Sequence, residues 1–415
     1  MKINTINSLT EGRFPFCNIK KMKLFYSFLV IASVIFSCSK DEVATDQQYS
    51  FIKFYGMGST SEGCDVKQLS DDSYIIFGTC TTADSGTDLF LIKVDKYGNE
   101  IWKKNFGTKY NETGYSMQPI PSGGYILLGT TQTNGSSGKL NTNIFLARTN
   151  NEGNSIIWKR TIGGDTTMIG YNIQITSSGG FIITGNAADA TGNYLLNVIT
   201  DADGNNQYVN LQLYSIVTKQ IINIDDGYLS VGTISKTTGI NMVINLKGGT
   251  DICITHTNNQ GKSYFVFNTG GAGTDEGECL KKLSDGSFLC LGTDSGSRIR
   301  LTKFTISGEY HSILWDKLYS SNGAIYNSKG MEVFSDNEYA IAGAIGVAPN
   351  QDIFFLRVDS TGNKISEIKT YIGNGNQSCS KIIKTNEGGF AIVGTNEYSG
   401  YSVISLFKVK SNGDF

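Results

Sequence analysis

Seven times along the chain, an aromatic residue stands four positions before a glycine, with a mostly apolar run between the two. The copies are Tyr74 to Gly78, Tyr125 to Gly129, Phe181 to Gly185, Tyr228 to Gly232, Phe288 to Gly292, Tyr339 to Gly343 and Phe390 to Gly394. Subtracting each glycine number from the next gives spacings of 51, 56, 47, 60, 51 and 51 residues. Self-similarity at a nearly constant period indicates a repeat architecture.

Each repeat contains four short segments with strand character. In the first copy these segments cover residues 64–69, 74–77, 88–95 and 100–106, with turn-forming residues at 71–73. One twisted four-stranded sheet cannot cover both of its faces, so it must stack on neighbouring sheets. The pattern therefore predicts that each repeat is one blade of a β-propeller.

A recurring turn separates the third and fourth segments. Asp95 is followed by Gly98 and Asn99, the same spacing returns at residues 201–205 and 359–363, and a copy that begins with Asn occupies residues 150–154. A carboxylate can close such a turn by accepting backbone N–H groups, and glycine can adopt a positive φ there. These segments therefore predict tight hairpins.

Seven repeats predict an all-β, seven-bladed propeller with four-stranded blades over residues 47–415. The seventh repeat supplies only three of its four segments, whereas residues 48–56 form a strand-like segment that belongs to no repeat. We expect this N-terminal strand to complete the last blade and close the ring, because closure removes two free sheet edges. The alternative architecture is a β-solenoid, whose repeats are usually shorter, with one strand per face.

The composition suits short strands joined by tight turns rather than long helices. There are 49 Gly against 4 Pro, aromatic residues make up 11% and charged residues 17%, and such usage favours strands and glycine turns. The formal net charge is −2. The basic excess of nucleic-acid-binding proteins is missing, so we expect no nucleic-acid partner.

The N-terminal region has the features of an export signal. Basic residues precede an apolar run at residues 24–36, which is too short to span a bilayer and suits the core of a signal peptide. The end of that run, Ile35-Phe36-Ser37-Cys38, resembles the lipobox of bacterial lipoproteins, and the resemblance implies that the Cys38 thiol carries diacylglycerol. We expect translation to begin at Met22, since residues 1–21 lack signal-peptide character.

The residues that follow Cys38 suggest a destination. Ser39-Lys40-Asp41-Glu42 resembles the export signal of Bacteroidetes-type surface lipoproteins, which reach the outer face of the outer membrane. The alternative is a plain solvated tether. The resemblance implies a signal peptide at residues 1–37, a lipidated tether at 38–46, and an outer-membrane protein that faces the cell exterior.

Six cysteines remain after Cys17 and Cys38. They show no C-x-x-C spacing and no nearby pair of histidines, so we expect no metal site. If the first hairpin turns around Asp72, Cys64 and Cys80 lie opposite each other, because 72 − 64 equals 80 − 72. A disulfide between them is one interpretation, and two small buried side chains is the favoured one.

Residues 92–102 and 150–158 each carry the Gly-Asn turn and end in tryptophan. They resemble repeats of quinoprotein-like and WD40-like β-propellers, in which a tryptophan of the fourth strand packs between blades. The resemblance covers nearly all of residues 47–415 and implies a fold rather than an activity. The chain departs from the quinone-dependent enzymes, since it has only Trp102, Trp158 and Trp315 and no adjacent cysteines. We therefore expect no cofactor.

The sequence offers few residues for hydrolytic chemistry. Its 2 histidines, His256 and His311, have no nucleophile motif near them. Acidic residues do recur before the first segment of several repeats, at Glu62, Glu112, Asp165 and Glu276. This recurrence predicts a carboxylate ring around one mouth of the central channel that binds a cation or a basic group. The alternative is a set of solvated loop carboxylates.

These features favour a non-enzymatic binding or scaffold propeller at the cell surface, held to the membrane by its lipid. Its expected role is glycan capture, adhesion or envelope-complex assembly, with a glycan or an envelope protein as the partner. The alternative is a polysaccharide lyase or glycoside hydrolase at the channel mouth, because paired carboxylates can cleave glycosidic bonds without histidine. We expect the ligand on the face whose connections vary most in length, which also carries Asn134, Lys139 and Lys236.

Overall fold

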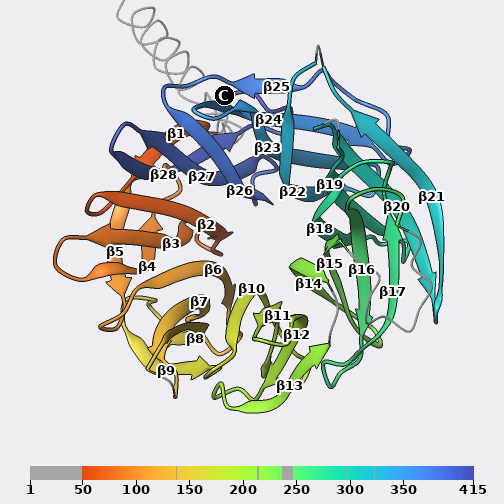
Figure 1. Cartoon of the computed structure of the whole chain (residues 1–415). Helices are drawn as coiled ribbons and strands as arrows, with labels where there is room; N and C mark the ends of the chain where they lie inside the picture. The colour runs from red at the N-terminus through yellow and green to blue at the C-terminus, as the bar shows by residue number, and fades with distance from the viewer. Residues whose placement is uncertain (1–48, 137, 213–214, 236–245, 296, 322) are drawn as a thin grey trace, which may run out of the picture. The chain divides into compact units, whose positions relative to one another are not determined.

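The computed structural model describes residues 49–136, 138–212, 215–235, 246–295, 297–321 and 323–415. These residues form 28 strands, arranged as seven four-stranded antiparallel sheets around a central channel (Figure 1). The predicted seven-bladed all-β propeller is confirmed. In the described ranges, no helix is long and apolar enough to cross a membrane. The predicted signal peptide, the tether with Cys38, and Lys236 lie outside the described residues.

The first three blades each use four consecutive strands, numbered from the channel outward. Blade I contains β2 (Thr60–Gln68), β3 (Tyr74–Thr82), β4 (Gly86–Val94) and β5 (Glu100–Phe106). Blade II contains β6 (Glu112–Pro119), β7 (Tyr125–Asn134), β8 (Leu140–Thr149) and β9 (Ile156–Ile162). Blade III contains β10 (Thr167–Ile175), β11 (Phe181–Ala188), β12 (Asn193–Thr200) and β13 (Asn206–Gln212).

Blades IV to VI repeat this order. Blade IV contains β14 (Ile216–Ile224), β15 (Gly227–Ile234), β16 (Asp251–Thr257) and β17 (Ser263–Thr269). Blade V contains β18 (Glu276–Lys282), β19 (Phe288–Thr293), β20 (Ile299–Ser307) and β21 (Tyr310–Tyr319). Blade VI contains β22 (Tyr326–Ser335), β23 (Glu338–Val347), β24 (Asn350–Asp359) and the short β25 (Lys369–Tyr371).

Blade VII is completed from the N-terminal side, as the sequence predicts. It contains β26 (Asn376–Lys384), β27 (Phe390–Tyr398) and β28 (Tyr401–Val409), and its outermost strand is β1 (Phe51–Tyr55). Strand β1 pairs with β28 in antiparallel register. The buried Tyr55 also donates a hydrogen bond to the Gly98 carbonyl of blade I, at 2.8 Å. The first strand therefore joins blade VII to blade I as well.

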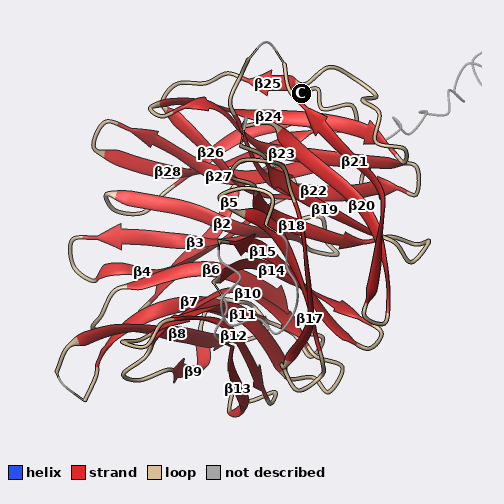
Figure 2. Cartoon of the chain, turned by 45° about the vertical axis from the view of Figure 1, so that its right-hand side comes forward, coloured by secondary structure: helices blue, strands red, loops and turns tan. Residues whose placement is uncertain are grey.

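The hydrophobic core consists of layers between neighbouring blades, which Figure 2 shows as stacked sheets. Between blades I and II, for example, Phe77 and Leu91 pack with Leu127 and Phe145, all at most 1% exposed. Trp102 packs against this same layer, and Trp158 packs against the layer between blades II and III. Trp315 packs against the layer between blades V and VI. The predicted role of tryptophan in inter-blade packing is confirmed.

Steric crowding explains why the repeated motif ends in glycine. At each of the seven positions, an added Cβ would lie 1.7 to 2.5 Å from a carbonyl oxygen of the inner strand. At Gly78, for instance, that oxygen belongs to Glu62, at 2.0 Å. Only glycine, which has no Cβ, lets the second strand come this close to the first. The motif glycine therefore marks the place where the inner strand lies closest to the second strand.

The turns between third and fourth strands close as predicted. The Asp95 carboxylate accepts the backbone N–H groups of Tyr97 and Asn99 at 2.9 and 2.8 Å, and Gly98 has φ of 77°. These turns share one face of the propeller, the tight-turn face, with the turns between first and second strands. The connections between second and third strands lie with the inter-blade loops on the opposite, variable-loop face, where Asn111 accepts from the Thr87 N–H.

The pairing of β2 with β3 separates Cys64 from Cys80. Cys80 lies opposite Ser61, whereas Cys64 is the extra residue of a β-bulge between Gly63 and Asp65. Both cysteines are free thiols, so the structure does not contain the disulfide. The symmetric count around Asp72 fails because Gln68 pairs with Tyr74, which centres the hairpin on Asp71, and the bulge then shifts the register by one more residue.

Candidate functional site in the central channel

Every inner strand carries a β-bulge at the same place, and the bulged residue faces the channel. The seven bulged residues are Cys64, Tyr115, Tyr171, Lys219, Glu278, Lys329 and Ser380. All seven line one cavity of about 260 Å³ in the central channel. Because bulges redirect side chains and recur next to functional sites, this ring is the candidate site.

In three blades, the residue after the bulge bonds to a backbone group of a neighbouring blade. The Asp65 carboxylate accepts the Met117 N–H of blade II at 3.0 Å, and the Asn172 side-chain oxygen accepts the Ile221 N–H of blade IV at 3.3 Å. Gln220 accepts the Leu280 N–H of blade V at 2.5 Å. These bonds satisfy backbone groups on the open inner edges. They also hold the channel wall in a fixed shape.

The inner strands bring five lysines and three carboxylates to the channel. Three ion pairs form, between Lys67 and Asp65 at 3.1 Å, Lys281 and Glu332 at 2.6 Å, and Lys329 and Glu278 at 2.7 Å. Within the described ranges, Lys219 and Lys381 form no ion pair with a carboxylate. The channel therefore holds a local excess of positive charge, although the whole chain carries a slight negative charge.

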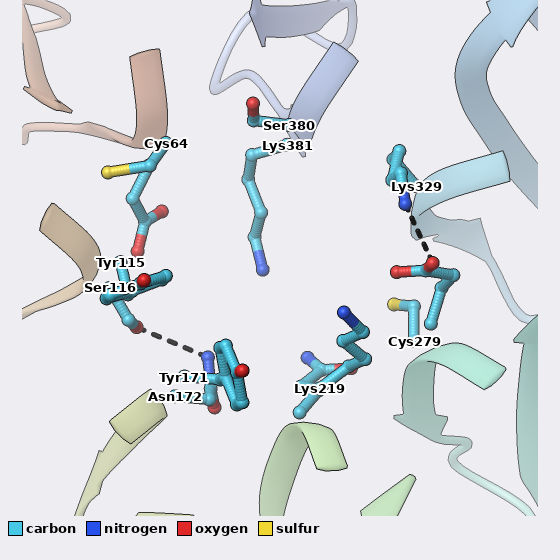
Figure 3. A pocket seen from close by; sticks show the side chains of 13 residues that line it. Cys64, Tyr115, Ser116, Tyr171, Asn172, Lys219, Cys279, Lys329, Ser380 and Lys381 are labelled. Atoms are coloured by element: carbon cyan, nitrogen blue, oxygen red, sulfur yellow. Dashed lines mark hydrogen bonds and ion pairs between the residues drawn. The ribbon is translucent and has the colours of Figure 1, made fainter. Parts of the chain in front are cut away.

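The two unpaired lysines point into the same space. Figure 3 shows Lys381 and Lys219 extending from different parts of the ring toward the middle of the cavity. Lys219 also lies over the Tyr171 ring, with its Nζ 5.3 Å from the centroid. Burial opposes the charge on Lys381, but the Asp65 carboxylate and other acidic neighbours raise its pKa above the ordinary value. Lys381 is therefore a cation at neutral pH.

The tyrosines of the ring are hydrogen-bond donors. Burial raises the pKa of both Tyr115 and Tyr171 above the ordinary value for tyrosine. Their rings contact edge to face, with centroids 5.4 Å apart. Both hydroxyls therefore remain protonated at physiological pH. They can donate to an anion but cannot act as bases in their resting state.

The four predicted carboxylates occupy different environments. Glu62 and Glu276 are exposed at corresponding places on β2 and β18, and each lines a separate cavity. Glu112 is fully buried, and its carboxylate accepts bonds from Thr108 and Thr131. Asp165 is exposed and accepts two 2.6 Å bonds from Ser136.

Sequence reasoning missed the residues of the bulge ring, although a signal was present. Counting ten residues back from the motif aromatic reaches the bulged residue in six blades, as from Tyr74 to Cys64, and counting nine reaches it in blade IV. A glycine precedes the bulge in four blades, at Gly63, Gly114, Gly170 and Gly277. The acidic residues that the sequence singles out, such as Glu62 and Glu276, lie before this point rather than at it.

Metal and histidine chemistry find little support in the described part of the chain. It contains no group of three or more His, Cys, Asp or Glu side chains placed to hold a metal ion. His256 is 1% exposed and contacts Asp226 at 3.2 Å and the Tyr264 hydroxyl at 2.8 Å through Nε2. It is a packed histidine near the tight-turn face.

No family model matches the sequence, and no curated protein matches it significantly. Among solved structures, the chain is similar to puromycin hydrolase, with 12% identity, a TM-score of 0.54 and coverage of 85% of this chain and 52% of that chain. The chain thus spans about half the length of that enzyme.

Two further structures align over most of their length. One is a chain from Drosophila Plexin A in complex with Semaphorin 1b, with 9% identity, a TM-score of 0.49 and 88% coverage of each chain. The other is a protein of unknown function from Dyadobacter fermentans DSM 18053, with 8% identity, a TM-score of 0.46 and coverage of 88% and 99%. The likeness to puromycin hydrolase, at 12% identity, bears on the fold alone.

Proposed function

We propose that this propeller is a non-enzymatic binding protein that captures a small anionic group in its central channel. The observation that carries the proposal is the pair Lys219 and Lys381, which share the cavity without a carboxylate partner in the described residues. Removing an ammonium group from bulk water costs free energy unless an anion or hydrogen bonds compensate. A carboxylate, sulfate or phosphate on a ligand would compensate Lys219 and would add to the attraction that Asp65 already exerts on Lys381.

The tyrosines favour binding over catalysis. A lyase needs a base that removes a proton, and the raised pKa values of Tyr115 and Tyr171 oppose that role. A glycoside hydrolase needs two carboxyl groups facing one bond. Glu278 is instead paired with Lys329, and Asp65 is bonded to Met117 and Lys67.

The protein is proposed to work at the outer surface of the outer membrane, anchored by a lipid on Cys38. An acidic glycan that carries uronate or sulfate groups is the ligand that suits both this proposed location and the positive charge of the channel. Glycan capture suits the molecule better than adhesion or envelope assembly, because the unpaired cations lie inside a channel rather than on a broad outer surface.

Calorimetric titration with glucuronate, galacturonate and a sulfated monosaccharide, with glucose as the neutral control, tests the proposal. We expect binding of the anionic sugars only. Lys219→Gln and Lys381→Gln should each weaken it about tenfold, since a charge-assisted hydrogen bond contributes about 1.5 kcal/mol or more. Lys364→Gln, on the periphery, is the matched control and should bind normally.

Two results would contradict the proposal. Equal affinity for glucose would show that the lysines do not select an anion. Appearance of unsaturated sugars or new reducing ends from an acidic oligosaccharide would show that the protein is a lyase or a hydrolase.

A further inference from the structure

A second cavity lies on the variable-loop face, where three blades meet. Its volume is about 670 Å³, and its walls come from Glu62 at the start of β2, Pro349 in a turn of blade VI, and Asn376 and residues 397–402 of blade VII. None of these residues belongs to the bulge ring. This rim cavity is therefore a separate place for a ligand.

Two stacked tyrosines form one wall of the rim cavity. Tyr398 and Tyr401 are cross-strand partners at the ends of β27 and β28, and Gly400 between them has φ of 92°. Their ring centroids are 4.9 Å apart with an interplanar angle of 22°. Tyr401 remains 50% exposed. The tight hairpin thus holds two stacked aromatic rings at the cavity wall.

Two carboxylates complete the rim cavity, and no basic side chain among the described residues lines it. Glu397 is held in place by Asn376, whose Nδ2 donates to it at 2.9 Å while its Oδ1 accepts the Gln351 N–H at 3.3 Å. Glu62 is exposed and forms no ion pair in the described ranges. The cavity therefore presents negative charge beside two aromatic rings.

We propose that the rim cavity binds the ammonium group of a small organic ligand. A cation is attracted to the face of a tyrosine ring and to a nearby carboxylate, and the two effects act together here. An anion would be repelled by Glu62 and Glu397. Two carboxylates without further ligands make a poor metal site. The proposal is independent of the channel, because the two cavities share no lining residue.

The test compares choline with 3,3-dimethylbutan-1-ol, its neutral isostere, by calorimetry or by NMR titration of the folded protein. We expect choline to bind and the alcohol to bind at least tenfold more weakly. Tyr401→Ala should weaken choline binding about tenfold and Glu62→Gln about threefold, as loss of a cation–π contact and of one carboxylate implies. Tyr401→Phe keeps the ring and should retain most of the affinity.

Matched controls separate this site from others. Glu276→Gln removes the corresponding carboxylate of blade V, and Tyr310→Ala removes a tyrosine that is 82% exposed on another hairpin. Both should leave choline binding unchanged, as should Lys219→Gln and Lys381→Gln. Glucosamine should bind more tightly than N-acetylglucosamine if the amine is what is recognised. Equal binding of the neutral isostere, or of the two sugars, would overturn the proposal.

Discussion

The carboxylate of Glu112 lies beneath the loop that joins blades I and II, with no exposed surface. It accepts the Thr108 N–H at 2.9 Å and the hydroxyls of Thr108 and Thr131 at 2.5 Å each. A buried carboxylate with three donors stabilises a loop in one conformation. Glu112 therefore has a structural role, whereas Glu276 is exposed at the start of the inner strand of its own blade.

Replacing Glu112 by alanine should lower the free energy of unfolding by about 3 kcal/mol, because the donors lose their buried acceptor. Urea denaturation followed by tryptophan fluorescence measures the change. Glu276→Ala is the control and should alter stability by no more than about 0.5 kcal/mol, as is usual for an exposed side chain. Equal effects of the two substitutions would refute the structural role of Glu112.

At the level of strands, the sequence predicts regular features well and single-residue irregularities poorly. The apolar runs that precede Gly78 and its six counterparts identify the second strands, because a fully buried strand needs an apolar run. The bulge at Cys64 shifts β2 by one residue against β3, and nothing in the alternation of apolar and polar residues requires that shift. The overlooked channel ring follows from this bulge, whereas the expected pairing of Cys64 with Cys80 fails first because the turn is centred on Asp71 rather than on Asp72.

Removal of β1 should destabilise the ring, since β28 would lose its outer partner and the Gly98 carbonyl would lose the hydrogen bond from the buried Tyr55. A protein that begins at Ser59 should melt about 10 °C or more below one that begins at Gln47, or aggregate through the exposed edge. Scanning calorimetry on both proteins tests this. Equal melting temperatures would show that β1 contributes nothing to closure.

For the whole molecule, a repeat period was sufficient to predict the number of blades, but not what the channel contains. The channel side chains come from seven strands, and their charges meet only after the ring has closed (Figure 3). Lys219 lies in blade IV and Lys381 in blade VII, with two blades between them in the sequence, so no local pattern relates them. Composition also concealed this excess of positive charge, because the net charge of −2 averages over the entire chain.

Anchoring of the whole protein is predicted to depend on Cys38. Cys38→Ala should abolish labelling by radioactive palmitate in the source cell and release the protein from the membrane fraction, because no acyl chain then holds it there. Surface proteolysis of intact cells measures which side of the membrane it faces. Labelling that persists in the variant would contradict lipidation at this residue.

The seam between blades VII and I also bears on how the protein is made. The Ser61 N–H donates to the Ser402 hydroxyl, 341 residues further along the chain. During synthesis, each of blades II to VI can stack on its predecessor as soon as it has emerged, whereas β1 has no strand to pair with until β28 exists. Such a distant pairing is formed late and slowly. We therefore expect an open-ring folding intermediate, with β1 unpaired, to be the species that chaperones must protect.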